Sequence, residues 1–540
     1  MNYRHTFLSF ILMAASTLAL QGAEYQRPQI NPVGNRNVAP GTPLTFQVSA
    51  TPANNPEHRF TALTYSGPLA SLVRGPGIDA YRSKPNARAY YVDSVRGNDA
   101  NDGSTPDTAW KNLSRVHALT FQPGDAIRLA RGSRWVRQSL YFDDGSQGTA
   151  SDPIVIEAYG EGEPPTISDP RAVWSEDRIW PGVCFATGGS PRKPAAYFHL
   201  LDIRVEDTID AGISLATGSH HVVVAGCEVR RCGTGISICG SNHRVVSNYL
   251  HDGIMAIDTG TNPEQDMGAM GVTVCGQDFE IAYNLFDNLV AESKAFGTDG
   301  AAVEFFGNTD GVGWNYVSNN VRFHHNVIRN TDCLIEGMGK ITNLVIAHNL
   351  VYDNPNHLFI FHMTPHWVDG AWVYNSYGVA IENNTILHDV FDSPMISLWG
   401  GDGTFQPGHQ IVVRNNIIRI NGLLAQNTTS VGASLVHDHN LFHFLPRGTF
   451  GSGNNAWVKH ETELVGDPQL VNPAGLDFRP GPESPASGAG VKPRYSLDLL
   501  GKRNPAVGSS LGAYLPCSNP SAEKSTLNLR PDTPTDPFPS

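Results

Sequence analysis

Four acidic residues fall into two copies of one short pattern. The first copy, Thr-Asp-Gly-Ala-Ala-Val-Glu from residue 298, contains Asp299 and Glu304. The second copy, Thr-Asp-Cys-Leu-Ile-Glu from residue 331, contains Asp332 and Glu336. When two carboxyl groups lie side by side, the protonated one can serve as a general acid and the ionised one as a nucleophile or base. If the two copies lie side by side, these four residues could perform acid–base chemistry.

Both glutamates occupy the second position of a recurring tetrapeptide whose first and third residues are mostly apolar. The second position holds Ser or Thr in four copies and Glu in two, and five of the six copies are followed by Gly. Such alternation is typical of a β-strand whose second side chain faces outward, and neighbouring strands lie about 4.8 Å apart. We therefore expect Glu304 and Glu336 to stack on an outer face, open to solvent. The copies begin at Ile213, Ile236, Val272, Val303, Ile335 and Ile396.

An asparagine repeat sets the length of the unit to which each strand belongs. Counted from a degenerate copy at Cys227, the intervals are 21, 36, 42, 23, 35 and 32 residues. A short period with variable insertions is typical of a stacked solenoid. The pattern predicts an all-β parallel β-helix with loop insertions, in which stacked asparagines satisfy the backbone of the turns. The repeated residues are Asn248, Asn284, Asn326, Asn349, Asn384 and Asn416.

The composition agrees with a β-rich fold and restricts the partners. Only 16% of the 540 residues are charged, and the chain holds 54 Gly and 37 Pro, which favours turns and strands over helices. The net charge of −13 argues against nucleic acid or an anionic membrane as a partner. We expect a polysaccharide or oligosaccharide as the ligand and a monomeric protein.

The chain divides into four segments by composition. Residues 1–23 carry Arg4, an apolar run and a small-residue site, as in a secretory signal peptide. This segment predicts secretion to the bacterial periplasm or to the extracellular medium. Residues 24–88 are predicted to be a linker or a partial Ig-like β arm, and residues 89–516 the parallel β-helix. Residues 517–540 are rich in Pro, Ser and Thr and are expected to be disordered.

The seven cysteines are spread along the chain rather than clustered. Cys239 and Cys275 take the same position in adjacent copies of the strand tetrapeptide. Such residues stack on adjacent coils, where they are close enough to form a disulfide if the geometry allows. We favour stacked free thiols.

The two ends of the solenoid resemble a known family. Tyr-Tyr-Val-Asp-Ser from residue 90, Gly-Asn-Asp-Ala-Asn-Asp-Gly from residue 97 and Ala-Trp-Lys-Asn-Leu from residue 109 resemble the entry of secreted right-handed parallel β-helix proteins of the pectate-lyase-like type. Asp-Pro-Gln-Leu from residue 467 resembles their closing coils. The resemblance spans residues 89–514 and implies a right-handed parallel β-helix. It leaves the reaction open, because such proteins include lyases, hydrolases and binders.

Long insertions leave the strand ladder next to the two glutamates and are rich in aromatic residues. Flat rings on loops suit stacking against sugars, and loops on a rigid scaffold often carry function. We therefore expect a groove along the strand face. The expected substrate contacts are Trp314, Tyr316, His362, Trp367, Trp372 and Tyr374.

Glycoside hydrolysis is the predicted reaction, without a cofactor or a metal site. Stacked glutamates favour the short carboxyl separation of retaining enzymes, with Asp299 and Asp332 tuning the pKa values of Glu304 and Glu336. Polysaccharide elimination is the alternative, with Lys340 as one candidate base and Ca²⁺ held by the two glutamates. A non-catalytic carbohydrate-binding β-helix is the third possibility. Further candidate bases for elimination are Lys294, Arg322, His324, His325 and His362.

Overall fold

The structure is a computed structural model, and it separates the chain into two compact units, Met1–Pro68 and Leu69–Ser540. Its described residues are 29–30, 50–51, 78–143, 145–169, 181–188, 193–209, 211–258, 266–305, 317–354, 356–362, 366–368, 371–373, 376–390, 393–399, 410–428, 434–505 and 508–517. The predicted signal peptide and residues 518–540 of the predicted tail lie outside this range, whereas Cys517, the first residue of that tail, is described and buried. Of the first unit it describes one antiparallel pair, β1 (Gln29–Ile30) with β2 (Ala50–Thr51).

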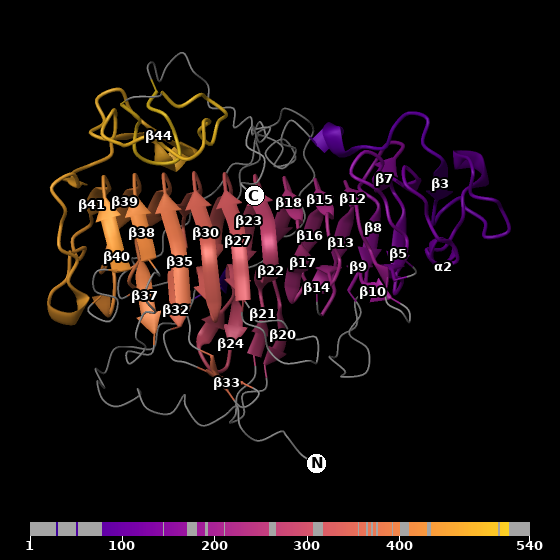
Figure 1. The fold of residues 1–540 in the computed structure, drawn as a ribbon, viewed down its shortest axis with the longest axis horizontal. Coiled ribbons are helices and arrows are strands. Elements are labelled where there is room, and N and C mark those ends of the chain that lie inside the picture. Colours follow the sequence, from indigo (N-terminus) through magenta and orange to yellow (C-terminus); the bar gives the residue numbers. More distant parts are fainter. Residues whose placement is uncertain are drawn as a thin grey trace. The chain divides into compact units, whose positions relative to one another are not determined.

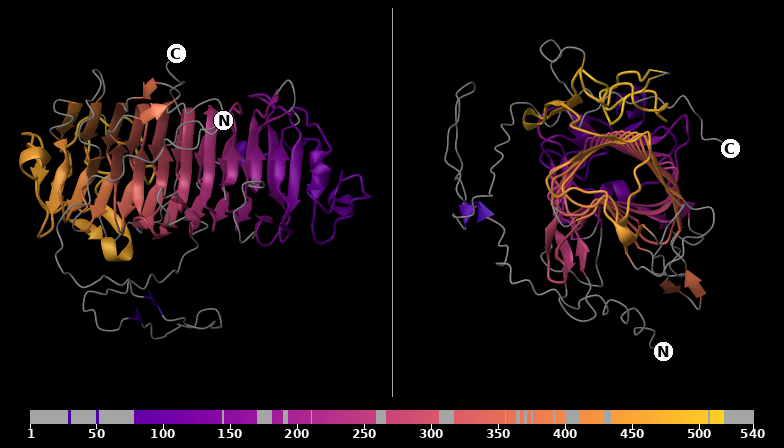
Figure 2. Two further views of the ribbon diagram at one scale, coloured as in Figure 1. Left: turned by 90° about the horizontal axis from the view of Figure 1, so that it is seen from below. Right: turned by 90° about the vertical axis from the view of Figure 1, so that its left-hand side faces the viewer.

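The second unit is a right-handed parallel β-helix: the repeats predict the parallel coils, and the family resemblance implies their hand. Each coil contributes strands to three faces, and equivalent strands of successive coils pair in parallel (Figure 1). One coil shows the order: β29 (Cys333–Gly337) lies on the first face, β30 (Lys340–Ala347) on the second and β31 (Leu350–Tyr352) on the third. Viewed along the stack, the strands of successive coils overlie one another (Figure 2, right).

The first face carries the tetrapeptide repeat found in the sequence. Its neighbouring strands pair without slipping, so that equivalent residues of the repeat lie opposite each other. In coil order they are β6 (Leu140–Phe142), β9 (Val183–Phe185), β14 (Ala211–Leu215), β17 (Thr234–Ser241), the start of β22 (Met270–Ala282), β26 (Ala301–Phe305), β29, β32 (Phe359–His362) and β37 (Ile396–Trp399).

The other two faces complete the coils. The second face runs through β3 (Ala89–Val92), β4 (Ala126–Ala130), β7 (Ile154–Tyr159), β12 (Phe198–Leu201), β15 (Val223–Ala225), β18 (Arg244–Val246), the end of β22, β27 (Val317–His324), β30, β35 (Ser376–Glu382), β38 (Gln410–Arg414) and β40 (Leu435–Asp438). The third face runs through β5 (Arg134–Val136), β8 (Thr166–Ser168), β13 (Arg204–Glu206), β16 (Glu228–Arg230), β19 (Tyr249–His251), β23 (Leu285–Leu289), β28 (Val327–Thr331), β31, β36 (Thr385–His388), β39 (Ile417–Ile420), β41 (Leu441–Phe444) and β42 (Leu464–Val465).

The core fills the space inside the coils with stacked apolar side chains. The third residue of β14, Ile213, is buried in a column that begins at Leu140 and passes through Ile335 to Ile396. Burial of side chains this large contributes about 1.5–3 kcal/mol each. The column explains why the first residue of each of the six tetrapeptides is Ile or Val; Leu140 and Phe359 take the equivalent place on β6 and β32.

The predicted asparagine ladder is confirmed at the corner between the second and third faces. The side-chain oxygen of Asn349 accepts hydrogen bonds from the backbone and side-chain nitrogens of Asn326, and its amide nitrogen donates to Phe323 O. The preceding residue, His348, has a φ of 54°, which tightens the corner. The ladder begins at the backbone nitrogen of Cys227, includes Asn440 in addition to the predicted members, and ends on Glu463.

The chain beyond β42 folds back on the outside of this same corner. Leu497 O accepts a hydrogen bond from His325 Nε2, and Ala513 N donates to Thr385 Oγ1. The resemblance implied closing coils here; the described strands β43 (Leu470–Asn472) and β44 (Asp477–Pro480) instead pair with each other in antiparallel fashion.

Candidate active site

Glu304 and Glu336 lie opposite each other on adjacent strands of the first face, β26 and β29. Their neighbours Val303 and Ile335 belong to the buried core, so both carboxylates project from the outer side of the coil. The predicted register is therefore confirmed. The predicted exposure is wrong for Glu304, which is only 7% exposed, whereas the side chain of Glu336 is 21% exposed. The outer side of the coil is covered at this point.

The two aspartates lie at the corner that leads into the first face. Asp299 ends β25 (Gly297–Asp299), which pairs with β24 (Ala291–Ser293) in a hairpin. Asp332 immediately precedes β29 and is buried. Thr298 Oγ1 donates a 2.5 Å hydrogen bond to Asp332 Oδ1, so the two copies of the sequence pattern are in direct contact. Asn356 Nδ2 adds a 3.3 Å contact to the other oxygen of Asp332.

A buried thiol shows that the four carboxylates form one cluster. Cys333 pairs with Ala301 across β26 and β29, and with Ile360 these residues make a small apolar cluster. Burial raises the pKa of Cys333 well above its usual value, and the negative charges of Glu336, Asp332, Glu304 and Asp299 raise it further. The thiol therefore stays protonated within the field of all four acids.

His362 contacts the carboxylate of Glu336. It ends β32, on the next coil, and its Nε2 lies 2.7 Å from Glu336 Oε1. Tyr377 holds the two strands together, because its hydroxyl oxygen lies 2.6 Å from His362 O and 2.9 Å from Gly337 O and its single proton is shared between these two carbonyls. Burial, together with the charge of Glu336, raises the pKa of Tyr377 well above its usual value. The phenol thus remains a hydrogen-bond donor that fixes His362 beside Glu336.

His357 is a further member of the site that the sequence did not reveal. Its backbone nitrogen donates to Asp332 O at 2.7 Å, and its Nδ1 lies 3.2 Å from Ser393 Oγ. Burial lowers the pKa of His357, and the charges of Asp332 and Glu336 offset this shift only in part. His357 lies two residues before Phe359, the position that Cys333 takes before Ile335 in the preceding coil. Aligning the two coils in the sequence would therefore have placed His357 next to Cys333 and the acidic residues.

The expected aromatic contacts are only partly described. Trp314, Tyr316 and Tyr374 lie outside the described residues. The backbones of Trp367 and Trp372 pair in the hairpin of β33 (His366–Val368) with β34 (Ala371–Val373), and their side chains lie outside the description. Sugar stacking by these residues stays a prediction.

Several candidate bases for elimination lie on other parts of the coils. Lys340 is exposed and begins β30, on the second face, where it pairs with Val317. Lys294 donates to Asp258 O at 2.8 Å. His324 and His325 are buried at the corner between the second and third faces, with their Nδ1 atoms 2.8 Å apart. Arg322 lies within β27 on the second face.

Cys239 and Cys275 form a disulfide, so the expectation of free thiols is wrong. The predicted stacking holds, since the two residues pair across β17 and β22 with their Cα atoms 4.6 Å apart. That approach lies within the range a disulfide needs. The five remaining cysteines are buried thiols.

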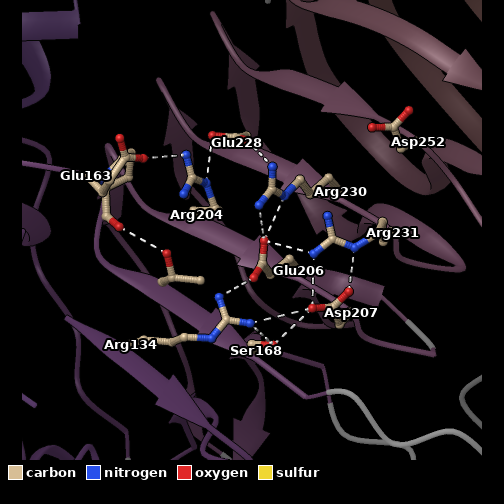
Figure 3. Close-up of polar contacts among 12 residues, drawn as sticks. Arg134, Glu163, Ser168, Arg204, Glu206, Asp207, Glu228, Arg230, Arg231 and Asp252 are labelled. Atoms are coloured by element: carbon tan, nitrogen blue, oxygen red, sulfur yellow. Dashed lines mark hydrogen bonds and ion pairs between the residues drawn. The ribbon is translucent and has the colours of Figure 1, made fainter. Parts of the chain in front are cut away.

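A second group of carboxylates lies on the third face and is paired with arginines (Figure 3). Glu206, 1% exposed, accepts hydrogen bonds from Arg134 and Arg230 and forms an ion pair with Arg231 at 3.1 Å. Burial alone would raise the pKa of Glu206, but the hydrogen bonds from Arg134 and Arg230 lower it. We call this group the arginine network; its other members are Ser168, Arg204, Asp207, Glu228 and Asp252.

The described residues form neither a metal-binding cluster nor a membrane-spanning helix. No three His, Cys, Asp or Glu side chains in that part of the chain gather as a metal site would require. None of its helices is long and apolar enough to cross a membrane.

No protein-family model matches the chain. A curated protein, lacto-N-biosidase of Bifidobacterium longum subsp. longum, is 35% identical over 125 residues, which are 22% of this chain and 8% of that protein. The chain therefore matches only a small part of this relative's length. The solved structure of pectate lyase Pel9A aligns with 81% of this chain and 97% of its own at 15% identity and a TM-score of 0.50. A GH136 lacto-N-biosidase from Eubacterium ramulus aligns with 70% of this chain and 67% of its own, at 15% identity and a TM-score of 0.38. The likeness to Pel9A agrees with a parallel β-helix fold.

Proposed function

We propose that this protein is a secreted retaining glycoside hydrolase that acts on a neutral polysaccharide or oligosaccharide. The observation that carries the proposal is the opposed pair Glu304 and Glu336, with His362 at 2.7 Å from Glu336. Neighbouring strands are about 4.8 Å apart, which suits the short carboxyl separation of about 5–5.5 Å in retaining enzymes. The partial match to a protein named lacto-N-biosidase supports the same class.

The two glutamates take different roles because their surroundings differ. Glu336 is the nucleophile, since the imidazole of His362 can donate a hydrogen bond to its ionised form. Glu304 is the acid, since it is the more deeply buried of the two carboxyl groups. Cys333 and Tyr377 stay protonated and hold the floor of the site.

The reaction then takes two steps. An oxygen of Glu336 bonds to the anomeric carbon as the glycosidic C–O bond breaks, and Glu304 gives its proton to the leaving oxygen. Water next bonds to the same carbon, the ester bond to Glu336 breaks, and Glu304 takes the proton of the water. The configuration at the anomeric carbon is retained.

The charge of the site favours a neutral sugar. Four carboxylates act on Cys333 together, and a uronic acid placed among them would meet like charges. Elimination needs that acidic sugar and a cation or arginine to neutralise it.

A glycan panel tests the proposal. Wild-type protein is incubated with neutral and acidic polysaccharides, and products are followed by reducing ends and by the ultraviolet absorbance of unsaturated ends. Reducing ends without unsaturation, retained anomeric configuration by NMR, and loss of activity in Glu304→Gln and Glu336→Gln are expected. Glu292→Gln, an exposed residue of the nearby β24, is the matched control. Unsaturated products, or full activity in either glutamate variant, would refute the proposal.

A further inference from the structure

The row of outward side chains that contains the two glutamates continues along the first face. Ser214, Ser237 and Thr273 take the equivalent position on β14, β17 and β22, and pair in sequence up to Glu304. In each case the flanking residues lie in the core, so the hydroxyl groups point outward. Three hydroxyls therefore lead along the coils to the carboxylates.

Exposure differs on the two sides of the glutamate pair. Ser214, Ser237 and Thr273 are all partly exposed. Beyond Glu336 the same row passes to Ile360, which is 3% exposed, and to Ser397, which is 1% exposed. Three partly exposed positions therefore precede the buried Glu304 on the amino-terminal side, and two buried positions follow Glu336 on the carboxy-terminal side.

The stretch up to Glu336 has a defined length. It begins at Ser214, because the equivalent residue of the preceding coil, Cys184, is buried, and Glu304, 7% exposed, is the one buried position within it. From Ser214 to Glu336 there are four strand spacings, which span about 19 Å. Its floor carries neutral hydroxyl groups, which can donate and accept hydrogen bonds as sugar hydroxyls do.

Both edges of the stretch are marked by further structure. The disulfide of Cys239 with Cys275 lies two residues along β17 and β22 from Ser237 and Thr273, on the same outer side. At the opposite edge the hairpin of β20 (Met255–Asp258) with β21 (Asp266–Gly268) leaves the chain between the third and first faces.

We infer that this row is a one-sided substrate track: the glycan lies along the coils from Ser214 to Glu336, and its end lies at the covered coil that carries Ile360. The inference rests on the proposed function and deepens it, because it assigns the binding subsites and the mode of action. All subsites but the terminal ones lie on the amino-terminal side of the scissile bond. Cleavage therefore occurs close to one end of the glycan chain.

Oligosaccharide ladders of the neutral glycan that the wild type cleaves test this track. Thr273→Phe fills the row next to the glutamates and should lower kcat/KM at least tenfold for every length. Ser214→Phe, at the far end, should lower kcat/KM about threefold for oligosaccharides of about four units or more and leave the shortest unchanged. Gln277→Phe, an exposed residue of the same strand β22, should change nothing. Thr273→Val removes only the hydroxyl and covers the case in which the larger side chain disturbs folding.

The outcomes separate the track from the reaction. Unchanged length dependence in Ser214→Phe and unchanged kcat/KM in Thr273→Phe and Thr273→Val, with hydrolysis intact, would overturn the track alone. Release of mid-length products from the earliest time points would also overturn it. If no glycan is cleaved, oligosaccharide ladders of each neutral glycan in the panel are titrated by calorimetry. Length-dependent binding that Thr273→Phe abolishes would support the track without hydrolysis, and no binding of any ladder would refute both.

Discussion

Two groups of carboxylates lie on the outer side of the same β-helix, and they differ in what the next coil places opposite them. On the third face, Glu206 pairs with Arg230 of the following coil (Figure 3). On the first face, Glu304 pairs with a second glutamate, Glu336. An outward-facing acid is thus paired with an arginine of the next coil on the third face, and with a second acid of the next coil on the first face. The arginine network stabilises the stack, whereas adjacent acids are suited to chemistry.

The largest expected effect is the loss of activity when the adjacent acids are changed. Glu336→Gln should lower kcat/KM about a thousandfold or more, because the nucleophile is lost. The melting temperature should stay the same or rise, since one of four clustered charges is removed. Kinetics on the cleaved glycan and thermal unfolding measure both. A variant that retains activity but unfolds at lower temperature would make the two groups alike.

The arginine network should respond in the opposite way. Glu206→Gln leaves three guanidinium groups around an uncharged amide, and should lower the free energy of unfolding by about 2–4 kcal/mol. The arginines are partly exposed, which keeps the loss below that of a fully buried pair. Activity per folded molecule should be unchanged. Urea unfolding gives the first value, and a loss under about 0.5 kcal/mol would show that the network is not stabilising.

His362 should have a smaller effect on activity than the acid it contacts. His362→Gln keeps a hydrogen-bond donor but removes the imidazole, and kcat/KM should fall about 10- to 100-fold. A positioning role predicts that kcat falls and that KM changes little. A change in KM alone would assign His362 to substrate binding instead.

The pH dependence of stability separates the arginine network from the buried histidines. Burial lowers the pKa of His348 to about 3 and that of His325 well below its usual value. Their unfolded forms bind protons below about pH 6.5 while the folded forms stay neutral, so stability falls as pH drops. The hydrogen bond from His251 is the main cause that lowers the pKa of Asp252 to about 2. This carboxylate therefore stays ionised throughout that window.

His251 itself acts in the opposite sense within the network. Burial lowers its pKa, but hydrogen bonds with Asp252 and Glu228 outweigh burial and raise it. Its contribution to stability is complete at low pH and is lost as pH rises through the folded pKa.

The variant His348→Phe tests the role of the buried histidines. It keeps the ring stacked 5.0 Å from His325 and should reduce the fall in the free energy of unfolding below pH 6.5 by about 1.4 kcal/mol per pH unit. Urea unfolding across this window measures the slope, with the exposed His460→Gln as control; an unchanged slope would contradict the assignment.

The coils and the glutamate register could be predicted because both depend on local repeats. Each Asn of the ladder contacts its equivalent in the next coil, so the sequence interval reports the spatial repeat directly. The position of Glu304 opposite Glu336 follows from the same alignment. Fold and pair are therefore properties of the periodic part of the chain.

Other features depend on contacts that no period encodes. The burial of Glu304 arises from what covers the outer side of the coil, and the sequence gives no measure of it. Contact between His357 and Asp332 depends on a corner of irregular length. The disulfide depends on Cβ directions as well as register, and the fold-back of residues 497–513 depends on packing between segments far apart in the chain.

The asparagine ladder has a consequence for how such a protein could change its specificity. Its hydrogen bonds join successive coils whether 21 or 42 residues separate them, so the alignment of the rungs does not depend on the length of the excursion between two asparagines. Segments inserted between rungs are therefore interchangeable parts. Exchange of one such part for that of another coiled protein should alter which sugar is accepted while the paired acids keep their relative position.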